Sequence, residues 1–430
     1  MRKITIFLAL LLVCSVSFAK GGEGENGNKE NEFNVGVQIR PRAEYRNGVI
    51  SPRIDGQDPA FFVTNRARMT MGYTGERLSI GLGAQHVGVW GQDPQIDKNG
   101  RFILNEAWAN LDMGGGFFAK LGRQSLVYDD DRILGSLDWN VAGRFHDALK
   151  LGFENPGNKL HLILSFNQND EKLAGTYYTA GAQPYKSMQT LWYQYIANKK
   201  FDASFLLMNL GLQAGDETTP ENRYLQTLGT NLSYKPGKIS LYGTAYYQMG
   251  KNMSNQDVSA YMFALNAAYQ VNPMWRFMVA TDYLSGDSGE SATEFKAFDP
   301  LYGTHHKFYG TMDYFYASRF IDGRNPGLWD NQVGVTCKAS PSVTLLLNYH
   351  YFMTTADVYV GTDKQKKGVG SEVDLQVNWN IMKDVNLSAG YSTMFGTDTF
   401  KVIKGGDPKA WQGWGWISLN INPKVFVSKW

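Results

Sequence analysis

Residues 33–46 read Phe-Asn-Val-Gly-Val-Gln-Ile-Arg-Pro-Arg-Ala-Glu-Tyr-Arg. Successive side chains of an extended chain point to opposite faces. One face of this stretch is therefore apolar, from Phe33 to Tyr45, and the other is polar and basic, from Asn34 to Arg46. The alternation lasts for 14 residues, well beyond the roughly five or six of a typical strand. It predicts a strand that crosses a membrane, with its apolar face toward lipid and its polar face toward a lumen.

The same alternation recurs near the C-terminal end. In residues 372–379 Glu, Asp, Gln and Asn alternate with Val, Leu, Val and Trp, and residues 385–392 alternate in the same way. Residues 343–352 alternate less cleanly, because Leu346 and Phe352 fall on the other face. Many segments run for about 10–13 residues, roughly the length that a tilted strand needs to cross the hydrocarbon.

The connections between these segments are of two kinds. Short ones rich in Gly, Pro and Asn suit tight hairpin turns, and they lie at residues 74–76, 113–115, 155–157, 198–199, 236–237, 272–273, 340–341 and 382–384. Longer polar ones include residues 47–60, 127–144, 169–187, 285–307 and 354–370. Short and long connections alternate, as periplasmic turns and external loops do in an outer-membrane barrel.

Eight turns and nine loops, with both chain ends in the periplasm, require 18 strands. Single-chain bacterial barrels have an even number of strands, so we assign the strand-like residues 308–315 to a long external loop between residues 285 and 327. Counts of 16 and 20 stay open. The last segment runs from Trp411 to Ile421, and Pro423 interrupts it before Val425. We expect an all-β fold, a transmembrane antiparallel up-and-down barrel over residues 33–430.

The start of the chain predicts export. Arg2 and Lys3 precede an apolar stretch at residues 4–13, and residues 17–19 (Ser-Phe-Ala) form a cleavage site, so residues 1–19 are expected to be a signal peptide. A lipoprotein signal at Cys14 is the alternative. Residues 20–32, rich in Gly, Glu and Asn, are expected to form a flexible periplasmic leader. Cleavage leaves Cys337 as the one cysteine, so no intrachain disulfide can form.

The composition narrows the class of protein. No stretch after the signal has the 18 or so apolar residues of a membrane helix, which leaves a soluble periplasmic protein, a secreted protein or a membrane barrel. Aromatic residues make up 14% of the chain, and it has 46 glycines. This mix suits strands with aromatic girdles at the membrane interfaces, although a secreted β-sandwich or propeller shares it. The net charge of +2 discriminates little, and we expect no nucleic-acid partner.

Several stretches carry a resemblance to a known family. They are Gly122-Arg123-Gln124, Asp130-Asp131-Arg132, Gly135-Ser136-Leu137-Asp138-Trp139 and Gly143-Arg144, then residues 282–287, 298–303 with His305, and 349–352. This pattern resembles the alginate export porin family. The resemblance implies an 18-stranded monomeric barrel with an arginine-rich, electropositive pore for an anionic polyuronate. It does not extend to the interrupted last strand or to the Glu-rich leader.

Basic residues are the candidates for solute contact. The lumen face of residues 33–46 carries Arg40, Arg42 and Arg46, and the polar face of the next segment carries Arg66 and Arg68. Arg123, Arg132 and Arg144, in and around residues 127–144, are expected to extend this track. A guanidinium group binds carboxylates bidentately and keeps its charge in a confined pore, and rings of basic side chains make a pore prefer anions.

Other interpretations of these residues stay open. The arginines can instead pair with wall carboxylates, for which Glu44, Glu106, Asp313, Glu372 and Asp374 are candidates. His305-His306 lacks a carboxylate at ligand spacing, so we expect no metal and no cofactor. Gly286-Asp287-Ser288-Gly289 matches the nucleophile motif of one serine-protease class, but it opens a loop and continues as Glu-Ser, so we interpret it as a chance match and expect no enzyme.

The sequence therefore predicts an outer-membrane porin with an arginine-rich lumen. Its expected partners are an anionic saccharide or small organic anion, and outer-membrane lipid. Alginate-type export and uptake are both compatible with a passive pore. The alternatives are a general small-solute porin without sugar specificity and an outer-membrane hydrolase.

Overall fold

The alternating stretch at residues 33–46 forms β1 (Glu32–Asn47), which pairs antiparallel with β2 (Ala60–Thr74). Ile39 and Tyr45 on the apolar face are 45% and 43% exposed, whereas Glu44 on the polar face is fully buried. Exposed apolar residues in strict alternation with buried polar ones are typical of a barrel whose outer surface meets lipid. The predicted assignment of the two faces is confirmed.

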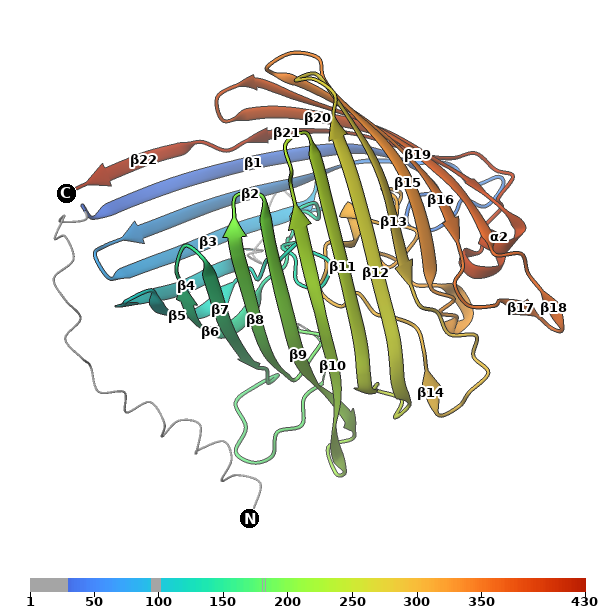
Figure 1. Ribbon diagram of the computed structural model, residues 1–430, viewed down its shortest axis with the longest axis horizontal. Coiled ribbons are helices and arrows are strands. Elements are labelled where there is room, and N and C mark those ends of the chain that lie inside the picture. Colours follow the sequence, from blue (N-terminus) through green and yellow to red (C-terminus); the bar gives the residue numbers. More distant parts are fainter. Residues whose placement is uncertain (1–29, 94–101, 180, 182) are drawn as a thin grey trace.

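The computed structural model describes residues 30–93, 102–179, 181 and 183–430, and within them 18 antiparallel strands close into a barrel (Figure 1). The expected signal peptide and most of the leader lie outside the described residues. After β1 and β2 the barrel strands are β3 (Leu78–Val89), β4 (Ile103–Gly114), β5 (Phe117–Gln124), β6 (His146–Glu154), β7 (Asn158–Phe166), β8 (Ser187–Asn198), β9 (Phe201–Gly215), β10 (Pro220–Tyr234), β11 (Ile239–Lys251), β12 (Asp257–Gln270), β13 (Trp275–Leu284), β15 (Leu328–Lys338), β16 (Val343–Met353), β19 (Gly368–Met382), β20 (Val385–Gly396) and β21 (Gln412–Ile421).

The last strand closes the barrel in two pieces. β21 pairs with the second half of β1, and β22 (Lys424–Lys429) pairs with its first residues. Proline has no N–H to donate to a sheet, so the chain bends at Pro423, whose carbonyl still accepts a hydrogen bond from Val37. β22 thus continues β21, and the predicted count of 18 is confirmed.

All eight predicted turns lie between consecutive barrel strands. The segment at residues 308–315 contains no strand in the described chain and belongs to the long β13–β15 loop, as predicted. That loop also holds β14 (Glu294–Phe295), η1 (His305–Lys307) and η2 (Ile321–Gly323). The short β17 (Tyr359–Val360), β18 (Asp363–Lys364) and α2 (Asp398–Lys404) lie in other loops, at the end of the barrel opposite the C-terminus (Figure 1).

Aromatic residues mark the two borders of the lipid-facing surface. Near the loop end the exposed rings include Tyr45, Tyr247, Tyr261 and Tyr349, and near the turn end they include Tyr195, Tyr234, Tyr269, Trp275 and Trp379. Tyrosine and tryptophan prefer the interface between hydrocarbon and water. The two girdles therefore place the membrane across the strands between them.

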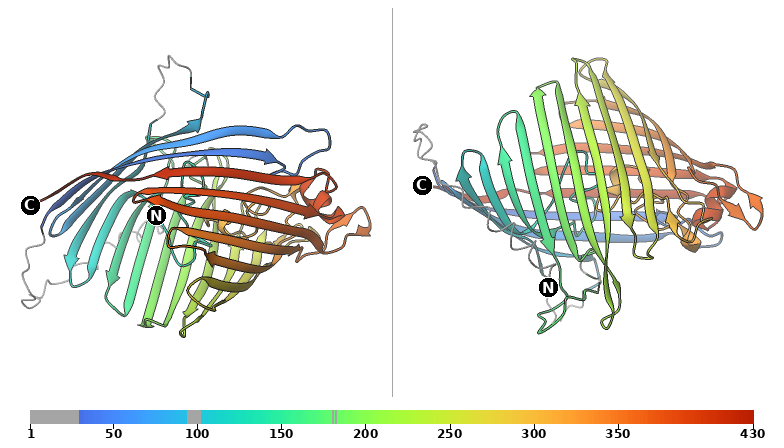
Figure 2. Two further views of the ribbon diagram at one scale, coloured as in Figure 1. Left: turned by 90° about the horizontal axis from the view of Figure 1, so that it is seen from above. Right: turned by 60° about the horizontal axis from the view of Figure 1, so that its bottom comes forward.

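Two loops fold into the barrel, where Figure 2 shows the strands surrounding them. The β5–β6 loop contributes Leu126 and Ile133, and the β13–β15 loop contributes Phe298 and Tyr314, all at most 2% exposed. The loops also meet each other, since the N–H of Gly135 donates to the carbonyl of Tyr302 at 3.0 Å. The hydrophobic core of this protein therefore lies inside the barrel rather than between layers.

Candidate functional site

Five arginines share one patch of the inner wall, on β1 and β2. They are Arg40, Arg42, Arg46, Arg66 and Arg68. Arg40 lies directly opposite Arg66 in the register of the two strands. Like charges at facing positions destabilise a sheet, so this patch needs counter-charges from elsewhere.

The β5–β6 loop supplies one of them, Asp138. Asp138 forms ion pairs with Arg40 at 3.0 Å and with Arg66 at 2.5 Å. Arg66 is fully buried and donates further to the carbonyls of Asn140 and Val141 at 2.7 and 2.6 Å. Burial would raise the pKa of Asp138, but the hydrogen bond and the charge of Arg66 outweigh it and lower the pKa below its ordinary value. The arginines therefore hold the loop by its backbone and by one carboxylate.

The other three arginines have partners on the wall. Arg42 and Arg46 bind the two oxygens of Glu44, each at 2.9 Å, and Arg68 donates to the amide oxygen of Gln85. Glu44 was among the carboxylates expected to pair with the arginines, and Asp138 was not. The five guanidinium groups of this patch form ion pairs with only these two carboxylates among the described residues. The patch keeps an excess of positive charge.

An aromatic cluster fixes the same loop. The ring of Trp139 stacks on His306, with centroids 4.2 Å apart, and meets Trp414 and Trp416 edge-on. The guanidinium carbon of Arg42 lies 4.3 Å from the same ring, within cation–π range. Trp139 thus connects the β5–β6 loop to the β13–β15 loop and to β21.

The backbone of the β5–β6 loop is strained at three residues. Asp129, Asp131 and Leu137 have φ values of 55°, 73° and 51°. This left-handed region is uncommon for residues other than glycine, and for a bulky one it is an outlier that persists only when surrounding contacts enforce it. Trp192 and Ser204 donate hydrogen bonds to Asp129, and Asp131 pairs with Lys307. The N–H of Leu137 donates to the hydroxyl of Thr304.

Arg132 crosses the lumen within this loop. It is 6% exposed and binds Asp130 at 2.7 Å and Asp282 of β13 at 2.9 Å. Its guanidinium carbon lies 3.9 Å from the ring of Phe308. Arg132 therefore ties the loop to the wall opposite the arginine patch, where Asp330 on β15 is also buried.

Arg144 and Arg123 lie in different surroundings. Arg144 donates to the carbonyls of Tyr302 and Gly303. Arg123 follows Phe117 and Leu121 on the same face of β5, and these are 53% and 62% exposed. The alternation of the strand therefore turns Arg123 outward. The expectation that Arg123 lines the pore is corrected: it pairs with Asp147 of β6 at 2.9 Å on the outer surface.

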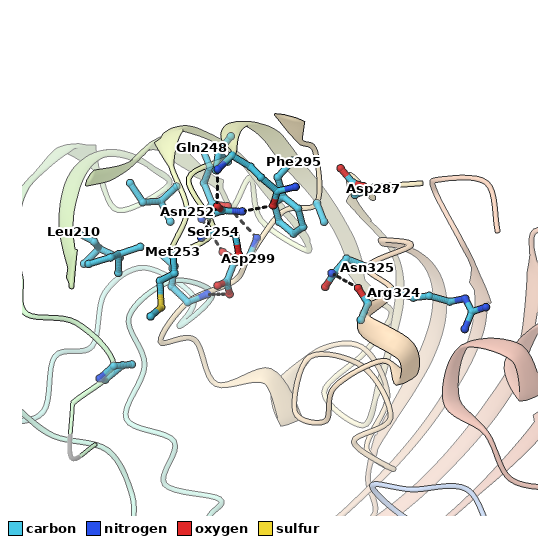
Figure 3. Close-up of a pocket in the computed structure, with 18 of the residues that line it drawn as sticks. Leu210, Gln248, Asn252, Met253, Ser254, Asp287, Phe295, Asp299, Arg324 and Asn325 are labelled. Atoms are coloured by element: carbon cyan, nitrogen blue, oxygen red, sulfur yellow. Dashed lines mark hydrogen bonds between the residues drawn. The ribbon is translucent and has the colours of Figure 1, made fainter. Parts of the chain in front are cut away.

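A cavity of about 1200 Å³ opens at the loop end of the barrel (Figure 3). Its lining includes Arg144 at the end of the β5–β6 loop, Gln248 and Asn252, and Arg324 and Asn325 of the β13–β15 loop. Amides and backbone groups make much of its polar surface; for example, Gln248 exchanges hydrogen bonds with the backbone of Asp299 at 2.7 and 2.9 Å. We call it the external cavity.

A second cavity, of about 600 Å³, lies at the turn end, below the start of the β5–β6 loop at Ser125–Asp129. Its basic lining residues come from separate strands or their ends and are Lys150, Lys159, Lys235 and Arg276. The sequence analysis singled out none of them, because each is an isolated charge in its own segment. We call it the periplasmic cavity. The described linings of the two cavities share no residue, and the β5–β6 loop lies between them.

Two further motifs are placed by the fold. The ring of His306 stacks on Trp139, and its Nδ1 lies 2.9 Å from the carboxylate of Asp313, which accepts a hydrogen bond from it. The described residues contain no group of three or more His, Cys, Asp or Glu side chains arranged to hold a metal. The carboxylate of Asp287 in the Gly-Asp-Ser-Gly motif accepts hydrogen bonds from the backbone of Gly289 and Lys296, which accounts for it as a loop-forming residue.

A closed barrel with two aromatic girdles, short turns and infolded loops defines an outer-membrane channel. None of the helices in the described residues is long and apolar enough to span a membrane. The sequence pattern of the family described as alginate export matches residues 32–409, and the chain belongs to that family. No curated protein matches the chain in sequence.

Solved structures with the same fold are outer-membrane proteins. OccAB1 of Acinetobacter baumannii superposes with a TM-score of 0.62 at 12% identity, covering 92% of this chain and 97% of that one. The outer membrane protein OprD of Pseudomonas aeruginosa gives 0.58 at 13% identity, with 91% and 94% covered. A BenF-like porin of Pseudomonas fluorescens Pf-5 gives 0.57 at 12% identity, with 91% and 99% covered. At such identities the likeness establishes the fold alone.

Proposed function

We propose that this protein is a passive channel of the outer membrane that prefers anions and passes acidic oligo- or polysaccharides, of the alginate type, or small organic anions. The observation that carries this proposal is the excess of positive charge on the β1–β2 patch of the inner wall, where five arginines share two carboxylates: four form ion pairs with them, and Arg68 binds the amide of Gln85. A narrow lumen with low-dielectric walls concentrates the field of such charges and raises the local concentration of counter-ions.

The arginines of the patch act in two ways in this proposal. Their donors are largely taken up by Asp138, Glu44 and the loop carbonyls, so their main effect on a solute is through their field. They also hold the β5–β6 loop inside the lumen, which sets the width of the passage. Arg132 holds the same loop from the other side, and Arg144 contributes its charge at the external cavity.

The test is the ion selectivity of the purified protein in planar bilayers. A salt gradient across the membrane should give a reversal potential of the sign expected for anion preference. Replacing Arg40, Arg42, Arg66 and Arg68 by Gln should reduce that preference. Cation preference, or no conductance, would refute the proposal. If alginate oligomers fail to block an anion-selective current, the saccharide part of the proposal is refuted and a general anion channel remains.

A further inference from the structure

Within the described chain, the basic side chains of the periplasmic cavity have no carboxylate, amide or carbonyl partner, unlike the arginines of the patch. Its four basic side chains are those of Lys150, Lys159, Lys235 and Arg276. None of them forms an ion pair or a side-chain hydrogen bond with another described residue; the ammonium of Lys150 lies 5.5 Å from the ring of Phe118. A cation left without a fixed counter-ion on a cavity wall is available to a charged solute.

The acidic residues of this cavity are occupied. Asp129 accepts hydrogen bonds from Ser204 and from the indole of Trp192, and burial raises its pKa to about 6 despite these bonds. Asp202 accepts a hydrogen bond from Gln194 at 3.2 Å. Neither carboxylate lies within ion-pair distance of the four cations. The cavity therefore presents more positive than negative charge to a molecule that enters it.

The neutral lining suits a hydroxylated ring. The cavity is bordered by Ser233, Ser240, Asn266 and Tyr242. The volume of about 600 Å³ lies within the roughly 300–1,000 Å³ of ordinary small-molecule sites. Such a site combines apolar and aromatic surface with a few polar groups that fix orientation, and Trp192 and Tyr242 supply the aromatic surface.

The external cavity has the opposite balance. Its lining includes Asp287, Asp299, Asp322 and Asp357 but only Arg144 and Arg324 as cations. Two of the acids are offset, because Asp322 pairs with Arg324 and Asp357 pairs with Lys364 and Lys367. No basic residue of its described lining is left without a partner, since Arg144 donates to backbone carbonyls. Of the two cavities, only the periplasmic one therefore has cations without a partner among its described lining residues.

We propose that the periplasmic cavity is a capture site for a carboxylated sugar residue, so that an acidic saccharide is loaded into the channel from the periplasmic side. This inference rests on the proposed function and adds to it a site and a side of entry. The carboxylate of the sugar binds among Lys150, Lys235 and Arg276, and its hydroxyls reach the serine, asparagine and tyrosine groups of the wall. A neutral saccharide of the same length lacks the first of these interactions.

The binding test uses the purified full-length channel, an alginate trisaccharide as the probe and maltotriose as its neutral counterpart. Isothermal titration calorimetry should show binding of the alginate trisaccharide and no binding of maltotriose. The Lys150→Gln, Lys235→Gln, Arg276→Gln triple variant should bind the trisaccharide roughly ten- to a hundredfold more weakly, since each exposed ion pair contributes roughly two- to fivefold. Lys238→Gln is the control, because Lys238 is exposed at the same end and lies outside the lining. Heat-modifiable migration on gels checks that each variant is folded.

The side of entry is tested by current block in planar bilayers. The substitution Glu217→Cys on the external loop, in a Cys337→Ser background, lets an impermeant thiol reagent report the orientation of each inserted channel. The trisaccharide should block the wild-type current at lower concentration from the periplasmic side, and the triple variant should lose this asymmetry. Equal block from both sides, or unchanged binding by the triple variant, would overturn the capture site while leaving an anion-selective channel intact. A wild-type channel without anion preference would instead refute the proposed function itself.

Discussion

Removing the guanidinium group of Arg66 should release the β5–β6 loop from the wall and widen the channel. Arg66 is fully buried, and three of its contacts with this loop are 2.7 Å or shorter: those with the carboxylate of Asp138 and with the carbonyls of Asn140 and Val141. Arg40 also binds Asp138 and the carbonyl of Asn140, so it duplicates part of this set. The bond to Val141 and one arm of the ion pair have no replacement among the described residues.

The magnitude follows from these two unreplaced contacts. A hydrogen bond to a charged group contributes about 1.5–3 kcal/mol, so the loss of these two contacts in Arg66→Met should weaken the attachment of the loop by about 3–6 kcal/mol. At about 1.4 kcal/mol per factor of ten, the ratio of attached to released loop should fall about a hundred- to ten-thousandfold. The single-channel conductance of Arg66→Met should rise, and the current should become noisier as the loop moves.

The control is Arg46→Met. Arg46 belongs to the same patch and carries the same charge, but it binds Glu44 on the wall and has no described contact with the β5–β6 loop. Its removal should lower anion preference without raising conductance. Equal conductance changes in the two variants would show that charge alone controls the current and would refute the anchoring role of Arg66. An unchanged conductance in Arg66→Met would refute it as well.

Three further predictions follow from the placement of single residues. Arg123→Gln should leave the anion selectivity unchanged, because Arg123 lies on the outer surface with Asp147, whereas Arg40→Gln should lower the anion selectivity. An equal loss of selectivity in both variants would show that Arg123 lines the lumen. Burial raises the pKa of Asp129 to about 6, so acidification from pH 7.5 to 5 should neutralise this carboxyl and increase the anion preference of the channel. Asp129→Asn should remove this component of the pH profile. A variant whose pH profile is identical to that of the wild type would contradict the prediction. Trp139→Ala should lower the free energy of unfolding by about 3 kcal/mol, the low end of the range for tryptophan in a core, because Trp139 is partly buried and its ring packs on His306, Trp414 and Trp416. A melting curve that coincides with that of the wild type would show that these contacts do not stabilise the protein.

The architecture was predictable because each residue of a barrel strand faces either lipid or the lumen, and its polarity matches the side that it faces. Lipid selects one face of β1 and the lumen selects the other, so the alternation from Phe33 to Arg46 survives in the sequence. The turns were equally readable, because a short hairpin needs Gly, Pro or Asn at fixed places. Strand number then followed from the turns. The break at Pro423 looked like a departure from the pattern, and it proved to be a bend within one strand that continues pairing with β1.

The contents of the lumen were not predictable in the same way. The partner of Arg66 is Asp138, 72 residues further along the chain, and no local pattern signals such a contact. Arg123 was misplaced because β5 carries phenylalanine on both faces, at Phe117 and Phe118, so the alternation there gives no clear outer side. The four cations of the periplasmic cavity were missed for a related reason. Each is alone in its segment, and only the closed sheet brings them to one wall.

These two failures have a common origin that bears on how the channel selects its solute. Clustered arginines attract attention in a sequence, but their mutual repulsion also requires acceptors close by. Here these acceptors are Glu44, Asp138, the amide of Gln85 and the carbonyls of an infolded loop. Cations that stand apart repel one another less and need no such compensation. In the proposed channel, we therefore expect the scattered cations to be best able to bind a carboxylate of the solute, and the arginine patch mainly to hold the loop that narrows the passage.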